Sequence, residues 1–89
     1  MQFEWDENKA RSNKAKHGVD FESAFSFDFE NAIVTVDDDF DYGEERLKAI
    51  GIIHGGIYVL VYTETEDIVR IISLRKANKT EARGYVESC

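Results

Sequence analysis

The fold follows from one stretch of the sequence, His54-Gly55-Gly56-Ile57-Tyr58-Val59-Leu60-Val61-Tyr62. Its last six residues are apolar on both faces of an extended chain and are rich in β-branched and aromatic side chains, which is typical of a central strand covered on both sides. The two glycines can adopt positive φ at no steric cost, so the segment before the strand is predicted to form a tight hairpin. Antiparallel pairing is expected there.

Outward from this hairpin the apolar residues alternate with a period of two, which predicts further strands. The expected strands are Gln2 to Trp5, Ala32 to Val36, Arg46 to Ile53, Ile57 to Thr63 and Ile68 to Leu74.

Three helices are expected beside these strands. Asp6 is a candidate N-cap for a helix that runs to about Lys16 and ends at Gly18 in the C′ position. A second helix is expected after Asp20, because Phe21, Ala24 and Phe25 stand at i, i+3 and i+4. Asn78 with Glu81 at N3 indicates a last short helix through about Glu87. The predicted fold class is α+β, a small antiparallel sheet with two N-terminal helices packed on it and a short C-terminal helix, as one domain over residues 1–89.

Composition narrows the class of protein. The chain has 89 residues, of which 43% are hydrophobic, and this is enough for one small core. No stretch approaches the roughly 18 apolar residues that a membrane span requires, and no apolar signal segment follows Met1, so a cytoplasmic protein is expected. The single cysteine, Cys89, argues against a disulfide framework and against a cysteine-based metal site. We expect no cofactor and no metal.

Charge is distributed unevenly along the chain. The formal net charge is −7, and ten acidic residues but no lysine or arginine lie between Asp20 and Glu45. The run Asp37-Asp38-Asp39-Phe40-Asp41 has three interpretations: a solvated loop, a surface for a basic protein partner, or a cation site. The cation site is the weakest of these, because the glycine and the closing glutamate of a calcium loop are missing at the required positions.

The opposite charge gathers near the C-terminus. The run Arg70-Ile71-Ile72-Ser73-Leu74-Arg75-Lys76-Ala77 places several cations at the end of an apolar strand, and Glu81 and Tyr85 follow. Positive charge concentrated in this way within an acidic chain indicates a site for an anion such as phosphate.

The order of several motifs resembles the BrnT family. These motifs are Phe3-Glu4-Trp5-Asp6, Lys9, Asn13, Lys16-His17-Gly18, Phe21, Gly43-Glu44-Glu45-Arg46, Ile50-Gly51, the run Arg70 to Ala77, Glu81 and Tyr85. The resemblance covers nearly the whole chain. It implies a small RelE-like ribonuclease toxin of a type II toxin–antitoxin pair, which cuts RNA without a metal. It also implies a BrnA-like antitoxin that neutralises the toxin, forms a heterotetramer with it through an antitoxin dimer, and binds operator DNA.

The chemistry of metal-free RNA cleavage can be matched to residues directly. The neighbouring 2′-hydroxyl attacks the phosphate, so the protein supplies a base, cations for the phosphate, and an acid for the leaving 5′-oxygen. Guanidinium groups suit the phosphate, which makes Arg70, Arg75 and Arg46 the candidates. Arg46 shares a strand face with Lys48 if the strand is regular. A salt bridge to a sheet carboxylate is the competing role for Arg70.

The geometry of Arg70 and Arg75 raises a difficulty. The two residues are five positions apart, so they point to opposite faces of a regular strand. We therefore expect Arg75 to lie at or beyond the end of its strand, where the backbone turns toward the last helix.

The acid and the base are less well defined by the sequence. Glu81 is a candidate base or a helix cap, and Tyr85 is a candidate for stacking on a base, for proton donation, or for packing on the sheet. His17 and His54 have suitable chemistry, but they stand at a helix end and in a hairpin. Lys48, Lys76 and Lys79 are expected to attract the RNA backbone.

Two other functions remain open from the sequence. One is a catalytically inactive RelE-like protein-binding module. The other is a DNA-binding regulator, which is disfavoured because no helix is strongly basic and no recognition-helix pattern is present.

Overall fold

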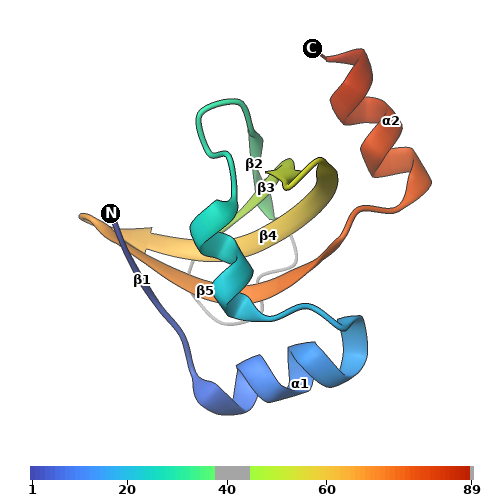
Figure 1. Cartoon of the computed structure of the whole chain (residues 1–89). Coiled ribbons are helices and arrows are strands. Elements are labelled where there is room, and N and C mark those ends of the chain that lie inside the picture. Colours follow the sequence, from blue (N-terminus) through green and yellow to red (C-terminus); the bar gives the residue numbers. More distant parts are fainter. Residues whose placement is uncertain (38–44, 89) are drawn as a thin grey trace.

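A computed structural model describes residues 1–37 and 45–88 of the chain. In chain order the elements are β1 (Gln2–Glu4), α1 (Glu7–His17), the 3₁₀ helix η1 (Phe21–Ser26), β2 (Ile33–Asp37), β3 (Arg46–Ile53), β4 (Gly56–Thr65), β5 (Ile68–Lys76) and α2 (Lys79–Glu87). Figure 1 shows a curved sheet with α1 beneath it and α2 beyond one end. No helix in the described ranges is long and apolar enough to cross a membrane. Of the acidic run Asp37 to Asp41, Asp37 ends β2 and positions 38–41 lie outside the described residues.

The strands of the described residues form one sheet in the order β1-β5-β4-β3-β2, with β4 at its centre. The predicted hairpin is confirmed: β3 and β4 pair antiparallel, and His54 and Gly55 make the turn with φ of 45° and 84°. The prediction of a purely antiparallel sheet is wrong, because β1 pairs parallel to β5, with Gln2 opposite Ile68. The sheet is therefore mixed, since the first and last strands meet side by side running in the same direction.

The prediction of two N-terminal helices on the sheet is also wrong. One α-helix, α1, is present before β2, with Asp6 as N-cap and Gly18 in the left-handed conformation at its end, as expected. Residues 21–26 form a 3₁₀ helix instead of a second α-helix. Phe21, Ala24 and Phe27 are buried at a spacing of three, which matches the three residues per turn of a 3₁₀ helix, whereas Phe25 is 66% exposed.

The main core lies between η1 and one face of the sheet. Its fully buried large side chains include Phe21, Leu60, Ile71 and Leu74. An aromatic cluster extends it, with the rings of Phe27 and Phe29 4.8 Å apart. Burial of each large apolar side chain contributes about 1.5–3 kcal/mol, so this face supplies most of the folding free energy.

Helix α1 is held against β5 by one buried asparagine. The Asn13 amide donates to the Leu74 carbonyl at 2.7 Å, and its oxygen accepts from the Leu74 N–H at 3.1 Å. Strand β1 pairs only with Ile68 to Arg70, so beyond Arg70 this edge of β5 has no neighbouring strand among the described residues. The Asn13 side chain takes the place of that strand at Leu74, because an amide carries the same donor and acceptor as a peptide group.

Strand β5 contains a bulge that decides which residues share a face. Val61 pairs with Ser73 but its neighbour Tyr62 pairs with Ile71, so Ile72 is skipped in the register. One extra residue reverses the alternation of side chains beyond it. Arg75 was expected at or beyond the end of its strand, and it lies next to the last residue of β5, still paired with Val59, so no turn of the backbone precedes it.

The bulge brings the two arginines to one face inside the strand. Arg70 stands opposite Thr63 and Arg75 stands opposite Val59, and these two partners are four residues apart on β4. Residues four apart on a strand point to the same face. The difficulty raised by their spacing is therefore removed by the extra residue and not by a turn.

Candidate active site

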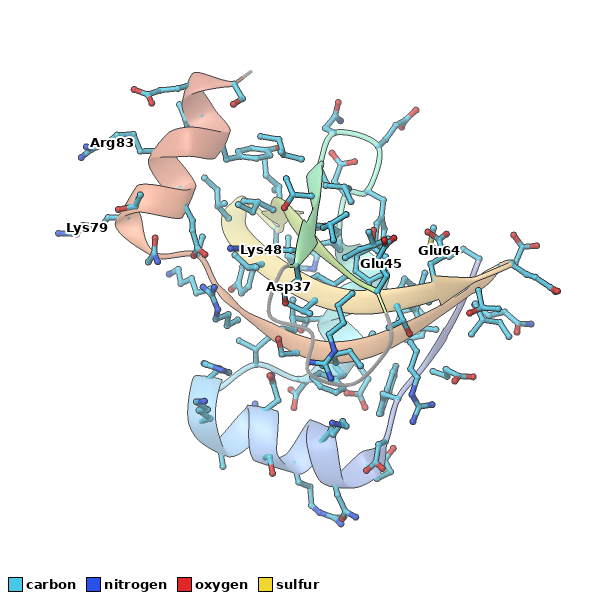
Figure 2. All side chains as sticks on the ribbon, turned by 180° about the vertical axis from the view of Figure 1, so that it is seen from behind. Asp37, Glu45, Lys48, Glu64, Lys79 and Arg83 are labelled. Carbon is cyan, nitrogen blue, oxygen red and sulfur yellow. The ribbon has the colours of Figure 1, made fainter. Side chains whose placement is uncertain are left out.

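Three charged side chains from three elements meet on the sheet face opposite the main core. Arg75 of β5 donates through both terminal nitrogens to the two oxygens of Glu81, at 2.7 and 2.8 Å. Lys48 of β3 lies 3.3 Å from Oε2 of the same carboxylate. We call Arg75, Glu81 and Lys48 the charge cluster. Figure 2 shows Lys48 pointing from β3 toward α2.

The sequence places Glu81 in this position through a helix cap. Asn78 accepts a hydrogen bond from the Glu81 N–H, and Oε1 of Glu81 accepts from the Asn78 N–H at 2.9 Å, which completes the predicted capping box. The same Oε1 receives Arg75. One carboxylate therefore both begins α2 and orients the guanidinium.

The charge cluster changes the acidity of its members. The hydrogen bond from Arg75 is the main cause that lowers the pKa of Glu81 to about 2, and the Asn78 N–H and Lys48 add to the effect against the opposing effect of burial. The hydrogen bond to Glu81 likewise raises the pKa of Arg75. With this arrangement of charges Glu81 is a weak proton acceptor at neutral pH.

The low pKa of Glu81 predicts a pH-dependent stability. Since its pKa is below the ordinary value of 4.5, the stabilisation is complete above about pH 4.5 and is lost as the pH falls through about 2. Over that window we expect wild type to lose about 1.5–3 kcal/mol more free energy of unfolding than Glu81→Gln, the range for hydrogen bonds to charged groups. Urea titrations at several pH values measure the difference. Glu87→Gln, on the same helix, should track wild type, and equal acid sensitivity of wild type and Glu81→Gln would contradict the prediction.

Arg70 lies apart from the charge cluster. Its guanidinium forms an ion pair with Glu4 of β1 at 2.8 Å, and both side chains are nearly half exposed. This partner lies on β1, a predicted strand whose parallel pairing with β5 the sequence did not predict. Arg70 and Arg75 share a face, but the five positions that separate them correspond to roughly 15 Å along the strand. One phosphate cannot bind both guanidinium groups in this arrangement.

The remaining candidates lie on the elements that carry the charge cluster, β3, β5 and α2. Arg46 lies two residues before Lys48 in the regular part of β3, so the two share a face as expected. Tyr85 is buried under α2, where its hydroxyl donates to the Asn31 carbonyl at 3.2 Å. Lys79 points outward from α2, away from Lys48 (Figure 2). Lys76 is exposed just before that helix.

Neither histidine lies on the part of the fold that forms the charge cluster. His54 is exposed in the β3–β4 turn. His17 is half-buried in the last turn of α1. Within residues 1–37 and 45–88, no three side chains of histidine, cysteine, aspartate or glutamate are grouped so that they could hold a metal ion.

Known proteins agree with these observations. A family model described as "Ribonuclease toxin, BrnT, of type II toxin-antitoxin system" matches residues 5–81. The crystal structure of the ribonuclease toxin BrnT from Brucella abortus superposes with a TM-score of 0.70 at 35% sequence identity, over 89% of this chain and 99% of that one. Among curated proteins none is significantly similar to the chain.

Proposed function

Since the chain belongs to the BrnT family of ribonuclease toxins of type II toxin–antitoxin systems, we propose that it cuts RNA without a metal ion. In this proposal the 2′-hydroxyl of one nucleotide attacks the adjacent phosphate, and the charge cluster is the centre of the reaction. Because the substrate is cellular RNA, the proposed place of action is the cytoplasm.

The observation that supports this proposal is the set of contacts that the Glu81 carboxylate makes with Arg75 and Lys48. Its two carboxylate oxygens occupy both terminal nitrogens of Arg75 and lie within reach of Lys48. A phosphate presents pairs of oxygens in a similar fork, and guanidinium groups bind carboxylate and phosphate with the same bidentate geometry. Glu81 thus stands in for the anion that the two cations are arranged to bind.

The same arrangement suggests how a base is generated. When a substrate phosphate takes the place of the carboxylate on Arg75, Glu81 loses the hydrogen bond that is the main cause of its low pKa. Its pKa then rises toward the ordinary value, and the freed carboxylate becomes a stronger acceptor for the 2′-hydroxyl proton. Substrate binding and activation of the base are coupled in this scheme.

The other predicted residues take supporting roles in the proposal. Arg46 adds charge on the face of Lys48, and Arg70 contacts RNA further along β5 once it leaves Glu4. Tyr85 donates a proton or stacks on a base if its hydroxyl is released from Asn31. Lys76 and Lys79 attract the phosphate backbone at the start of α2.

The nuclease chemistry is tested with a single-stranded RNA and chelator present. We expect cleavage to persist in excess EDTA and to stop when the nucleotide on the 5′ side of the cut carries a 2′-deoxyribose, because its nucleophile is missing. A 2′,3′-cyclic phosphate product is expected by mass spectrometry. Loss of cleavage in EDTA that returns with added metal, or cutting of the deoxy substrate, would overturn this mechanism.

The proposed partner is a BrnA-like antitoxin, with two toxin chains bound to an antitoxin dimer. The family description supports an antitoxin partner, and the acidic segment from Asp20 to Glu45 suits a basic surface on it. The mass of the complex purified after co-expression with the neighbouring gene tests this composition. A 1:1 heterodimer would refute the stoichiometry.

A catalytically inactive binding module is the alternative. It is favoured by one observation, which is that each of these cations already has a carboxylate partner: Arg75 and Lys48 share Glu81, and Arg70 is paired with Glu4. The RNA assay separates the two functions directly, since an inactive module leaves the substrate intact.

A further inference from the structure

A cavity of about 390 Å³ lies between α1 and β5. Its lining includes Lys9, Ser12, Lys16 and His17 from one face of α1, and Ile72 and Ser73 from the bulge of β5. Among the described residues no carboxylate lines it. In an acidic chain this concentration of basic and polar side chains around one hollow indicates a site for an anion.

The two lysines are available for such an anion. Both are exposed, and within the part of the chain that the structure describes neither takes part in an ion pair. Lys14, on another face of the same helix, is by contrast paired with Asp20 at 3.2 Å. Helix stability does not account for Lys9, since it stands in the first turn of α1, where the helix dipole disfavours a positive charge.

Strand β5 contributes residues both to the cavity and to the charge cluster. Ser73 lines the cavity and lies two residues before Arg75, so both point to the same face about 7 Å apart along the strand. Ser73 also stands in line with Lys48 across the sheet, because each of them pairs with Val61. A single strand of RNA bound at the charge cluster therefore has a short path to the cavity.

We propose that this cavity binds a backbone phosphate of the RNA substrate, next to the phosphate that is cut. This inference rests on the proposed nuclease function and names a second binding point for the same substrate. Lys9 and Lys16 hold the phosphate, and the hydroxyl of Ser12 or Ser73 donates to it. The cavity then fixes how the strand runs across the charge cluster, which base recognition alone does not do.

The test measures binding separately from cleavage. A single-stranded oligonucleotide with 2′-O-methyl groups throughout is not cut by 2′-hydroxyl attack, and its dissociation constant is obtained by fluorescence anisotropy. We expect the double variant Lys9→Gln with Lys16→Gln to bind roughly tenfold more weakly than wild type near 0.1 M salt. The slope of log K against log salt should fall by about 0.7 for each phosphate that the variant no longer neutralises.

A matched variant and a set of outcomes complete the test. Lys14→Gln removes one positive charge, half of what the double variant removes, from the same helix outside the cavity, and it should bind nearly as wild type does. Equal affinity for the double variant and Lys14→Gln, or no binding of the oligonucleotide to wild type at low salt, would overturn the cavity site. Failure of RNA cleavage with the binding difference intact would overturn the nuclease proposal alone. Thermal melting checks that the variants are folded.

Discussion

Replacing Arg75 with alanine should lower the rate of RNA cleavage by roughly 10²- to 10³-fold, the usual loss when one preorganised donor to a transition-state oxyanion is removed. Arg75 has the geometry for this role, because its two terminal nitrogens already bind a pair of oxygens at 2.7 and 2.8 Å. Initial rates on a defined single-stranded RNA, with EDTA present, measure the effect. Arg75→Lys should recover little of it, since lysine cannot bind two oxygens in a fork.

The stability of α2 has to be separated from catalysis in this experiment. Without Arg75, Glu81 keeps its capping bond to Asn78 but loses its strongest partner. Arg83→Ala is the matched control, because Arg83 projects from α2 away from the sheet (Figure 2). We expect Arg83→Ala to retain activity. Full cleavage by Arg75→Ala, with melting curves showing a folded protein, would remove the charge cluster from the mechanism.

Replacing Asn13 with alanine should cause the largest loss of stability of any change on α1. The variant leaves the N–H and the carbonyl of Leu74 without their partner at a buried edge. Each unsatisfied buried group costs about 1–3 kcal/mol, so we expect a loss of roughly 2–5 kcal/mol. A domain of this size is stable by about 5–15 kcal/mol in total. The melting temperature should fall by at least roughly 10 °C.

Calorimetry or far-UV circular dichroism measures this change. Asn8→Ala is the control, because Asn8 is an exposed asparagine of the same helix whose side chain bonds to Arg11 at the surface. Asn13→Asp should also be destabilised, since a carboxylate accepts from the Leu74 N–H but cannot donate to its carbonyl. If Asn13→Ala and Asn8→Ala melt together, the amide does not stabilise the edge of β5.

The sequence predicted those turns, strands and helix ends that depend on interactions between residues close together in the chain. The hairpin turn at His54 and Gly55, the alternation on either side of it, and the caps Asp6 and Asn78 each depend on interactions within a few residues, and the structure contains all of them. The parallel pairing of β1 with β5 joins residues 66 positions apart. The residues next to each strand carry no signal that predicts this pairing. Its prediction from periodicity alone therefore failed.

Two other differences arise from spacing that fits more than one structure. Phe21 and Ala24 suit a 3₁₀ helix as well as an α-helix, and the burial of Phe27 rather than Phe25 distinguishes them. The sequence does not show that Ile72 is the bulged residue, because Ile71 and Ile72 are both isoleucine and either could take that position. Tertiary packing selects which of the two takes the unpaired position.

The candidate site was predictable in its residue types more than in its geometry. The cationic run pointed to Arg75, and the capping pattern pointed to Glu81, but neither pattern shows that the two side chains bind each other and Lys48. The place of Lys9 and Lys16 beside the cavity was missed, although their i, i+7 spacing with Asn13 between them marks one face of α1. The sequence does not show that this face of α1 lies beside β5, and the cavity depends on that contact.

The skipped residue of β5 sets which strand lengths are compatible with this arrangement of arginines. Without Ile72, Ile71 and Ser73 would be consecutive opposite Tyr62 and Val61, so Arg70 and Arg75 would be four positions apart and would still share a face. A chain with five positions between the two arginines needs the bulge, whereas a chain with four needs only a regular strand. We therefore expect related sequences to tolerate the loss of this one residue, and the change would remove the side chain of Ile72 from the cavity beside α1.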